Sequence, residues 1–341
     1  MIQQALSRLL DGRSLRREEA RAVMDTVMAG EATQAQIAAF LVALRAKGET
    51  AEEIAGCAEA LRAHALPVRP RREDLVDTAG TGGDGQATLN LSTAAALVAA
   101  AAGAAVAKHG NRAVSSACGS ADVLEALGFA LELPPERVAR SIDELGFGFL
   151  FAPALHPGFR HAAPVRRELG VRTVFNLLGP LANPAGARSQ IVGVYGPELV
   201  PTLAQVLAQL GARRALVVHG AGGIDELSPA GPNLVCEVEA GAVRERVIDP
   251  AELGLQRCSP EVLRGGSPQE NAATLRSVLA GKDRSGRRSA VLLNAAGALV
   301  ACGRAEDLRE GLALAAETID SGAAIARLEE LVAFSQKEAR R

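Results

Sequence analysis

The chain has 341 residues, 48% of them hydrophobic, and its formal net charge at pH 7 is −2. This length is sufficient to bury a large core in one or two domains, and the near-balanced charge gives no support for a nucleic-acid partner held by bulk electrostatics. The longest uncharged, mostly apolar run, residues 91–107, is shorter than the about 20 strongly apolar residues that a membrane-spanning helix needs. The five cysteines form no Cys-x-x-Cys pair and the N-terminus has no secretory apolar segment, so we expect reduced thiols in a cytoplasmic protein.

Residues 1–66 are predicted to be helical throughout, because their apolar residues recur at helical spacing. Gly48 is expected to end one helix, and Thr50 with Glu53 forms a capping box for the next. The proline- and arginine-rich stretch 67–72 (PVRPRR) is expected to be a hinge. The sequence therefore predicts a small, all-helical N-terminal domain.

Strand and helix signals alternate beyond residue 72. Strands are expected at 75–78, 104–107, 215–218 and 291–294, and helices near 94–102, 199–210, 270–280 and 307–317. This alternation predicts a larger α/β domain with a central, mostly parallel sheet covered by helices.

A glycine turn and a helix start follow the first expected strand. Between Gly80 and Gly85 four glycines permit positive φ and let backbone N–H groups approach an anion closely. Asn90, Ser92 and Thr93 then precede an alanine-rich helix, whose free N–H groups and dipole favour phosphate. Both features are typical of a phosphate site.

A third motif, which is cationic, follows the second expected strand. Lys108, His109, Asn111 and Arg112 come after 104–107, at the sheet edge where ligands bind in open α/β folds. From charge alone Lys108 and Arg112 could equally be surface cations, but their place between a buried strand and a serine-rich turn favours phosphate contact. Three such motifs in succession indicate a ligand with more than one phosphate group.

The glycines also match the dinucleotide-binding pattern G-x-G-x-x-G at Gly80, Gly82 and Gly85. That fold requires an acidic residue about 20 residues further on to bind the ribose. Between Gln86 and Ala121 the chain has neither Asp nor Glu. A nicotinamide-dependent dehydrogenase is therefore disfavoured.

Several motifs in order resemble those of the anthranilate phosphoribosyltransferase family, and the resemblance extends from the N-terminal helices almost to the C-terminus. The motifs lie at 80–84, 90–93, 108–112, 115–116, 119–122, 165–170, 172–176, 178–181 and 225–226. The resemblance implies Mg2+-dependent transfer of the ribosyl 5-phosphate of phosphoribosyl pyrophosphate to the amine of anthranilate, with two Mg2+ ions. It also implies a homodimer without membrane partners.

The resemblance further implies that residues near 164–182 join the helical domain, while 73–163 and 183–341 form the phosphoribosyl pyrophosphate-binding domain. The active site would then lie in a cleft between the two bodies. Ile37, Phe40 and Leu41 of the helical region could serve either the dimer interface or the core of the small domain.

Site residues follow from the resemblance. Those expected at phosphoribosyl pyrophosphate are Gly80, Gly83, Asp84, Thr88, Asn90, Leu91, Ser92, Thr93, Lys108, His109, Gly110, Asn111, Arg112, Ala113, Val114, Ser115, Ser116 and Ser120. Asp84 is expected to face the ribose or a metal-bound water, and His109 to position groups rather than transfer protons.

Anthranilate is expected to bind the backbone at Gly80, the side chain of Asn111 and Arg166, whose guanidinium fork suits a planar carboxylate. The Mg2+ ligands are expected to be Ser92, Asp225 and Glu226. From the sequence alone, an Asp-Glu dipeptide such as Asp225-Glu226 is more often a solvated acidic pair in a turn. The resemblance instead favours a metal-ligand role for these two residues.

Two segments depart from the family pattern: Leu89 replaces Phe, and Gly158-Phe159 replaces Ala-Met on the expected acceptor path. Two alternatives share this architecture. A pyrimidine nucleoside phosphorylase is disfavoured by the 80–84 and 108–112 motifs. A binding-only relative would be expected to lose Arg166 or Asp225-Glu226, and both are present.

Overall fold

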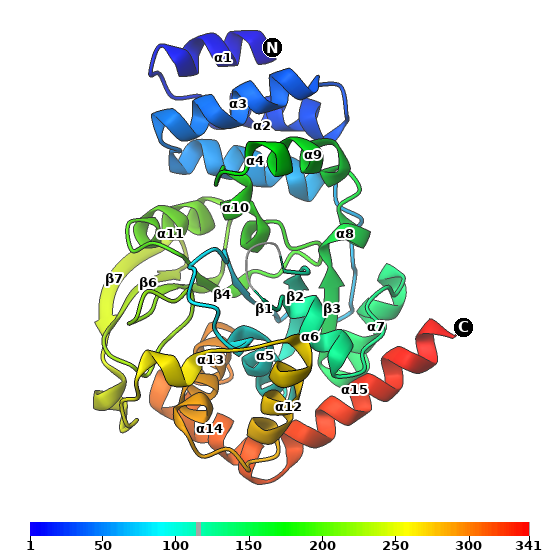
Figure 1. The fold of residues 1–341 in the computed structure, drawn as a ribbon, viewed down its shortest axis with the longest axis vertical. Helices are drawn as coiled ribbons and strands as arrows, with labels where there is room; N and C mark the ends of the chain where they lie inside the picture. Colours follow the sequence, from blue (N-terminus) through cyan, green and yellow to red (C-terminus); the bar gives the residue numbers. More distant parts are fainter. Residues whose placement is uncertain (114–116, 341) are drawn as a thin grey trace.

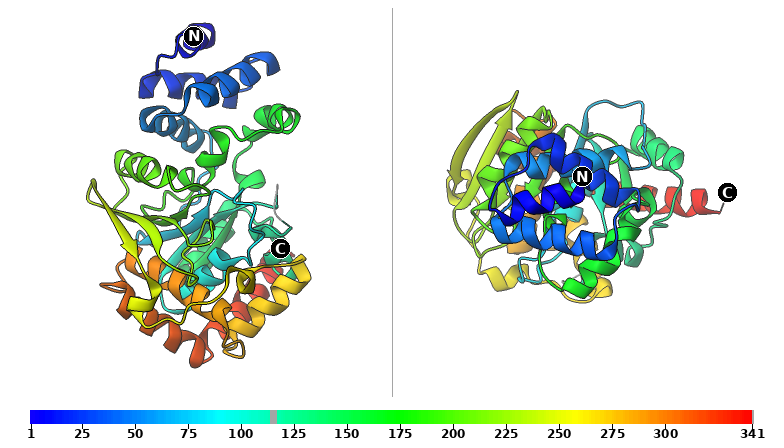
Figure 2. Two further views of the ribbon diagram at one scale, coloured as in Figure 1. Left: turned by 60° about the vertical axis from the view of Figure 1, so that its left-hand side comes forward. Right: turned by 90° about the horizontal axis from the view of Figure 1, so that it is seen from above.

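A computed structural model describes residues 1–113 and 117–340 of the chain. The expected donor residues Val114, Ser115 and Ser116 lie outside the described residues. Figures 1 and 2 show a layer of helices from the N-terminus at one end of the molecule and the C-terminal helices at the other, with a sheet between them. No helix of the described chain is long and apolar enough to cross a membrane.

Four helices form the N-terminal layer: α1 (Ile2–Leu10), α2 (Arg17–Met28), α3 (Gln34–Lys47) and α4 (Ala51–Ala63). The predicted capping box is confirmed, because the Thr50 hydroxyl accepts from the Glu53 N–H and the Glu53 carboxylate accepts from the Thr50 N–H at 2.8 Å. Gly48 ends α3 with a φ of 90°, as the sequence predicts.

A later part of the chain contains α8 (Ala152–Leu155), α9 (Phe159–Leu169), α10 (Phe175–Leu178) and the 3-10 turn η1 (Gly179–Leu181). Two of these helices return to the N-terminal layer. Helix α9 packs against α2 and α3, and α10 packs against α4 (Figure 1). Arg166, on α9, is thereby held by the helical layer.

In the described chain, seven strands form one sheet in the order β3-β2-β1-β4-β5-β6-β7. Their bounds are β1 (Leu75–Gly80), β2 (Ala105–Gly110), β3 (Phe147–Phe151), β4 (Ser189–Gly193), β5 (Arg214–His219), β6 (Asn233–Glu239) and β7 (Ala242–Ile248). The first five strands in this order pair in parallel, and β6 and β7 add an antiparallel hairpin at one edge. The small helical domain and the larger, mostly parallel α/β domain confirm the predicted fold class.

The remaining helices cover the sheet. They are α5 (Leu91–Ala101), α6 (Ser120–Ala126), α7 (Pro135–Leu145), α11 (Leu199–Gln209), α12 (Pro268–Leu279), α13 (Gly286–Ala301), α14 (Leu308–Asp320) and α15 (Ala323–Ala339), with 3-10 turns η2 (Pro250–Leu253) and η3 (Pro260–Leu263). One core lies between a face of the sheet and α5, α6 and α12–α15. A second is continuous from the N-terminal helices through α11 to the opposite face of β4–β6. Ile37, Phe40 and Leu41 are buried in this second core.

The structure corrects three local predictions. The strand expected at 291–294 is wrong: the segment lies inside α13, which is buried on all sides from Ala290 to Ala301, so that no helical periodicity appears in its apolar run. The helix expected from residue 94 begins at Leu91, which puts Ser92 and Thr93 in its first turn. Strand β2 extends to Gly110, so Lys108 and His109 lie within the strand rather than after it.

Candidate active site

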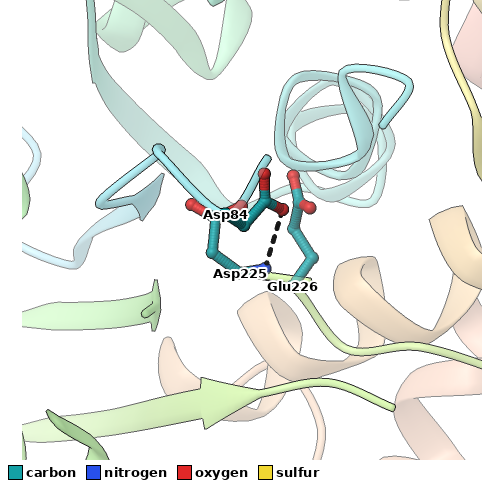
Figure 3. A group of neighbouring side chains, drawn as sticks. All are labelled: Asp84, Asp225 and Glu226. Carbon is teal, nitrogen blue, oxygen red and sulfur yellow. Dashed lines mark hydrogen bonds between the residues drawn. The ribbon is translucent and has the colours of Figure 1, made fainter. Parts of the chain in front are cut away.

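Three carboxylates meet at the carboxyl edge of the sheet. Asp84 lies in the glycine turn after β1, and Asp225 and Glu226 lie in the turn after β5, on the far side of β4. One oxygen from each carboxylate lies within 4.8 Å of the others (Figure 3). The backbone N–H of Asp225 donates to Asp84 Oδ2 at 3.3 Å.

Glycines allow the two turns to approach this closely. The N–H of Gly82 donates to Asp225 Oδ2 at 2.7 Å. A Cβ at Gly80 would overlap the Asp225 carboxylate, and a Cβ at Gly193 on β4 would overlap its backbone carbonyl. Gly82 and Gly83 have φ of 64° and 75°, a region that L-residues rarely adopt. The glycine turn is therefore folded onto the three carboxylates of Asp84, Asp225 and Glu226, which we call the acidic group.

The acidic group is crowded with like charge. Burial, and then the neighbouring Asp84, raise the pKa of Asp225 to about 7. Burial and Asp225 hold the pKa of Glu226 well above its usual range, with Lys108 acting against the shift. A cation among these oxygens would relieve the repulsion.

The donor set suits a hard divalent cation. Mg2+ prefers oxygen ligands and takes few protein carboxylates, and three carboxylates converge here. Ser92 lines the same small cavity as Asp225 and Glu226, which brings the predicted metal ligands together. Asp84, predicted to face ribose or water, lies within the acidic group itself.

Lys108 is buried beside this group, with 1% of its surface exposed. Its ammonium donates to the backbone carbonyl of Thr78 and lies 3.3 Å from the Ser92 hydroxyl. Burial lowers the pKa of Lys108 to about 8, while Asp77, Glu226 and Asp225 oppose the shift. The sequence favoured phosphate contact over a surface cation and placed Lys108 after the strand, whereas the structure buries its ammonium within β2 as a fixed charge at the base of the site.

The other expected donor residues are brought together around the start of α5. Asn90 occupies the N-cap position of α5, but its side chain forms no capping hydrogen bond: its Nδ2 donates to the Cys118 carbonyl at 3.0 Å. Thr88 Oγ1 lies 3.4 Å from Glu226 Oε2, so the segment before α5 touches the acidic group. The Ser120 hydroxyl donates to the Asn111 carbonyl at 3.3 Å.

Arg112 is exposed, and its guanidinium is paired with two acidic side chains of α6. Its guanidinium donates to Asp122 at 3.1 Å and to Glu125 at 2.8 and 3.0 Å. Asp122 also accepts from the N–H groups of Ala113 and Gly119. Arg112 could therefore contact a phosphate only after its guanidinium releases Asp122 and Glu125.

A series of rings leads away from the sheet edge toward α9. The His109 ring centroid lies 5.0 Å from that of His156, His156 lies 5.2 Å from Phe159, and Phe159 lies 5.7 Å from Phe175. The Arg166 guanidinium lies 5.0 Å from the centroid of the Phe175 ring. Among the described residues Arg166 forms no ion pair, whereas the neighbouring Arg167 points to solvent.

The two histidines are kept neutral. Burial lowers the pKa of His109 to about 4 and, with His109 nearby, that of His156 to about 3. His109 Nδ1 lies 3.0 Å from the Gly179 carbonyl, and its backbone N–H donates to Asp77. His109 Nε2 and His156 Nε2 are buried without a hydrogen-bond partner among the described residues.

Residues outside the expected set also shape the site. Arg172 stacks over Tyr195 at 4.3 Å and donates to the Gly83 carbonyl at 3.4 Å, which ties the segment after α9 to the glycine turn. His156 and Phe159 belong to the ring series. The only sequence signal for these two was the departure at Gly158-Phe159 from the family pattern.

Comparisons with known proteins agree with this architecture. A family model described as "Glycosyl transferase family, a/b domain" matches residues 72–325, and one described as "Glycosyl transferase family, helical bundle domain" matches residues 3–65. An anthranilate phosphoribosyltransferase of Anaeromyxobacter sp. (strain Fw109-5) is 57% identical over 336 residues, which cover 98% of this chain and 99% of that one.

Solved structures show the same likeness. The crystal structure of anthranilate phosphoribosyltransferase from Thermus thermophilus has a TM-score of 0.93 at 53% identity and covers 97% of this chain and 99% of its own. The Saccharomyces cerevisiae enzyme in complex with PRPP and Mg has a TM-score of 0.89 at 30% identity, covering 98% of both chains. The same yeast enzyme in complex with 4-fluoroanthranilate has a TM-score of 0.88 at 29% identity, again covering 98% of both chains.

Fold and site thus define a glycosyl transferase built from a helical bundle and an α/β domain. The identity to the curated relatives extends over nearly the whole chain. The chain belongs to the anthranilate phosphoribosyltransferase family.

Proposed function

We propose that this protein transfers the 5-phosphoribosyl group of phosphoribosyl pyrophosphate to the amine of anthranilate, as the second step of tryptophan synthesis from chorismate. The observation that carries the proposal is the convergence of three carboxylates on the glycine turn and the start of α5. Few ligands other than a metal-bound diphosphate need carboxylates, glycine N–H groups and a helix N-terminus together. The yeast relative bound to PRPP and Mg supports this interpretation.

In the reaction a C–N bond forms between the anthranilate nitrogen and the anomeric carbon, the C–O bond breaks so that pyrophosphate leaves with its electron pair, and the nitrogen releases one proton to solvent. Anthranilate's amine is neutral at pH 7, so its lone pair is available without a strong base. The neutral His109 is consistent with a positioning role. The chain's contribution is alignment and electrostatic stabilisation.

Asp84, Asp225, Glu226 and the Ser92 hydroxyl would hold the metal. When bound, Mg2+ neutralises the charge that develops on the departing pyrophosphate. We propose two ions, because Mg2+ usually takes only one or two protein carboxylates and three are available here. Lys108 adds a fixed positive charge at the base of the site.

For the acceptor, Arg166 would bind the anthranilate carboxylate. Its guanidinium is half-buried, free of acidic partners among the described residues, and oriented by Phe175. The Gly80 backbone and the Asn111 side chain complete the proposed acceptor site. The yeast relative with 4-fluoroanthranilate supports an aromatic acceptor of this kind.

We further propose that 1–66 with 164–182 form one body and that 73–163 with 183–341 form the other, with 67–72 as the hinge. The packing of α9 on α2 and α3 supports this division. We also propose a cytoplasmic homodimer. Exposed apolar side chains at Leu10 of α1 and Val42 of α3, together with free cysteines in the described chain, support that proposal.

The reaction can be followed directly by anthranilate fluorescence. The chain has no tryptophan and one tyrosine, so protein emission scarcely interferes. On mixing with phosphoribosyl pyrophosphate and Mg2+ we expect a loss of anthranilate signal that chelator prevents and that Asp225→Ala/Glu226→Ala abolishes. If phosphoribosyl pyrophosphate raises the melting temperature while the signal persists, the proposed acceptor is wrong. If neither effect is seen, the transferase proposal fails.

A further inference from the structure

One buried amide, on α12, links two of the loops assigned to the donor site. Asn271, with 2% of its surface exposed, lies in the first turn of α12, outside the motifs that define the family resemblance. Its Nδ2 donates to Asn90 Oδ1 at 3.0 Å, and Asn90 Nδ2 in turn donates to the Cys118 carbonyl at 3.0 Å. We call this chain of two bonds the amide relay.

The relay has a fixed direction. Asn271 Oδ1 accepts from the Gly266 N–H at 2.7 Å, which leaves only Nδ2 to face Asn90. Asn90 must then present Oδ1 to Asn271 and Nδ2 to Cys118, because each amide has one acceptor and one donor end. Reversing either amide would place two acceptors against each other.

The relay joins segments that the backbone leaves separate. Residues 263–265 run antiparallel to 87–89, where Leu89 N–H donates to the Leu263 carbonyl and Gly265 N–H donates to the Ala87 carbonyl, both at 2.8 Å. Ala87 has a φ of 50°, an unfavourable value for a residue with a Cβ, so outside contacts must hold this segment. Asn271 connects it through Asn90 to Cys118, directly before α6.

Both connected loops face the proposed donor. Thr88 of the first contacts Glu226 of the acidic group, and Ser120, two residues after Cys118, begins α6. Building on the proposed function, we propose that Asn271 is a positioning residue of the donor site, which sets the distance between these two loops. Asn271 lies behind Asn90, and its side chain also interacts with the Cys118 thiol, so it would act through these two residues.

The test is steady-state kinetics of the full chain carrying Asn271→Asp. This change keeps the volume and the acceptor for Gly266 but replaces the donor toward Asn90 with a second acceptor. We expect the KM for phosphoribosyl pyrophosphate to rise on the order of tenfold. The kcat and the KM for anthranilate should stay within about twofold, as for a loss confined to donor binding.

Gly265→Ala provides a second variant with Asn271 intact. A Cβ at Gly265 would lie 2.9 Å from the Asn271 amide and 3.0 Å from the Thr88 carbonyl, and so would displace the same contact. We expect the same selective rise in KM. Ser141→Ala, which removes a buried bond from α7 to the Phe147 carbonyl far from the relay, is the matched control and should leave both KM values unchanged.

An unchanged KM for phosphoribosyl pyrophosphate in both variants of an active enzyme would overturn the inference. Loss of folding in both would overturn it too, because Asn271 would then be a structural residue. A wild-type chain that consumes no anthranilate would contradict the proposed function instead. In that case the rise in melting temperature with phosphoribosyl pyrophosphate alone would decide the inference. The variants should need about tenfold more phosphoribosyl pyrophosphate than wild type to reach the same rise.

Discussion

The two sides of the site are built on different principles. On the donor side, Asp84, Asp225, Glu226 and Lys108 form a dense set of charges, each fixed by backbone hydrogen bonds or burial. On the acceptor side, four rings and the Arg166 guanidinium contact one another with few hydrogen bonds, and two histidine nitrogens have no partner among the described residues. The first side thus presents a dense set of charges, and the second presents ring surfaces with a single guanidinium.

This difference has a consequence for tolerance to change. Charges in a buried site depend on one another, so removing one leaves its neighbours uncompensated. Apolar rings can be exchanged for others of similar volume at modest cost. We therefore expect substitutions of the donor-side charges to affect the whole reaction and substitutions on the acceptor side to affect only the acceptor.

The largest effect is expected for Asp84→Asn, which tests whether Asp84 is a metal ligand. We expect kcat/KM to fall about 100-fold and the Mg2+ concentration for half-maximal rate to rise. Without Mg2+ the melting temperature should increase, because Asp84 helps to raise the pKa of Asp225 by repulsion. Glu239→Gln, at an exposed carboxylate on β6, is the control. An unchanged Mg2+ requirement would remove Asp84 from the metal site.

Arg166→Lys tests the acceptor side, with Arg167→Lys as its neighbour control. A lysine keeps the charge but loses the planar fork, so we expect the KM for anthranilate to rise about ten- to a hundredfold. The KM for phosphoribosyl pyrophosphate should not change. Equal effects of the two variants, measured by anthranilate fluorescence, would show that position 166 has no special role.

A smaller effect concerns acid stability. An ordinary histidine has a pKa near 6.5, and burial lowers that of His156 to about 3. As the pH falls below 6.5 the unfolded chain therefore binds the proton first, and the free energy of unfolding falls. When the pH is lowered from 7 to 5, we expect the free energy of unfolding, measured with urea, to fall by about 2 kcal/mol less for His156→Phe than for wild type. His161→Phe, at a less buried ring, should follow wild type, and equal pH slopes for wild type and His156→Phe would contradict the assignment.

Local signals in the sequence predicted the fold class and part of its elements. The Thr50 cap, the Gly48 helix end and strand β5 follow from short-range patterns. The strand expected at 291–294 is wrong because complete burial removes periodicity. Strands β3 and β4 and the hairpin β6–β7 were not predicted from the sequence.

The site itself depends on contacts between distant residues. The glycine turn and its Asp225 partner are 143 residues apart, and nothing in the sequence alone pairs them. Motif order identified Asp225, Glu226 and Ser92 as a set, whereas the inclusion of Asp84 and the burial of Lys108 required the folded chain. The ring series through His156 and Phe159 combines segments from the sheet edge and α9, which is again a tertiary property.

The continuous second core also bears on how the chain can be divided. Family descriptions separate a helical bundle from an α/β domain, yet the apolar side chains of the bundle, α11 and one face of β4–β6 form a single cluster. A gene fragment that began at residue 72 would encode a protein with this apolar surface uncovered, which favours aggregation. The bundle is therefore not an exchangeable module, and chimaeras between relatives should take the bundle and α11 from the same parent.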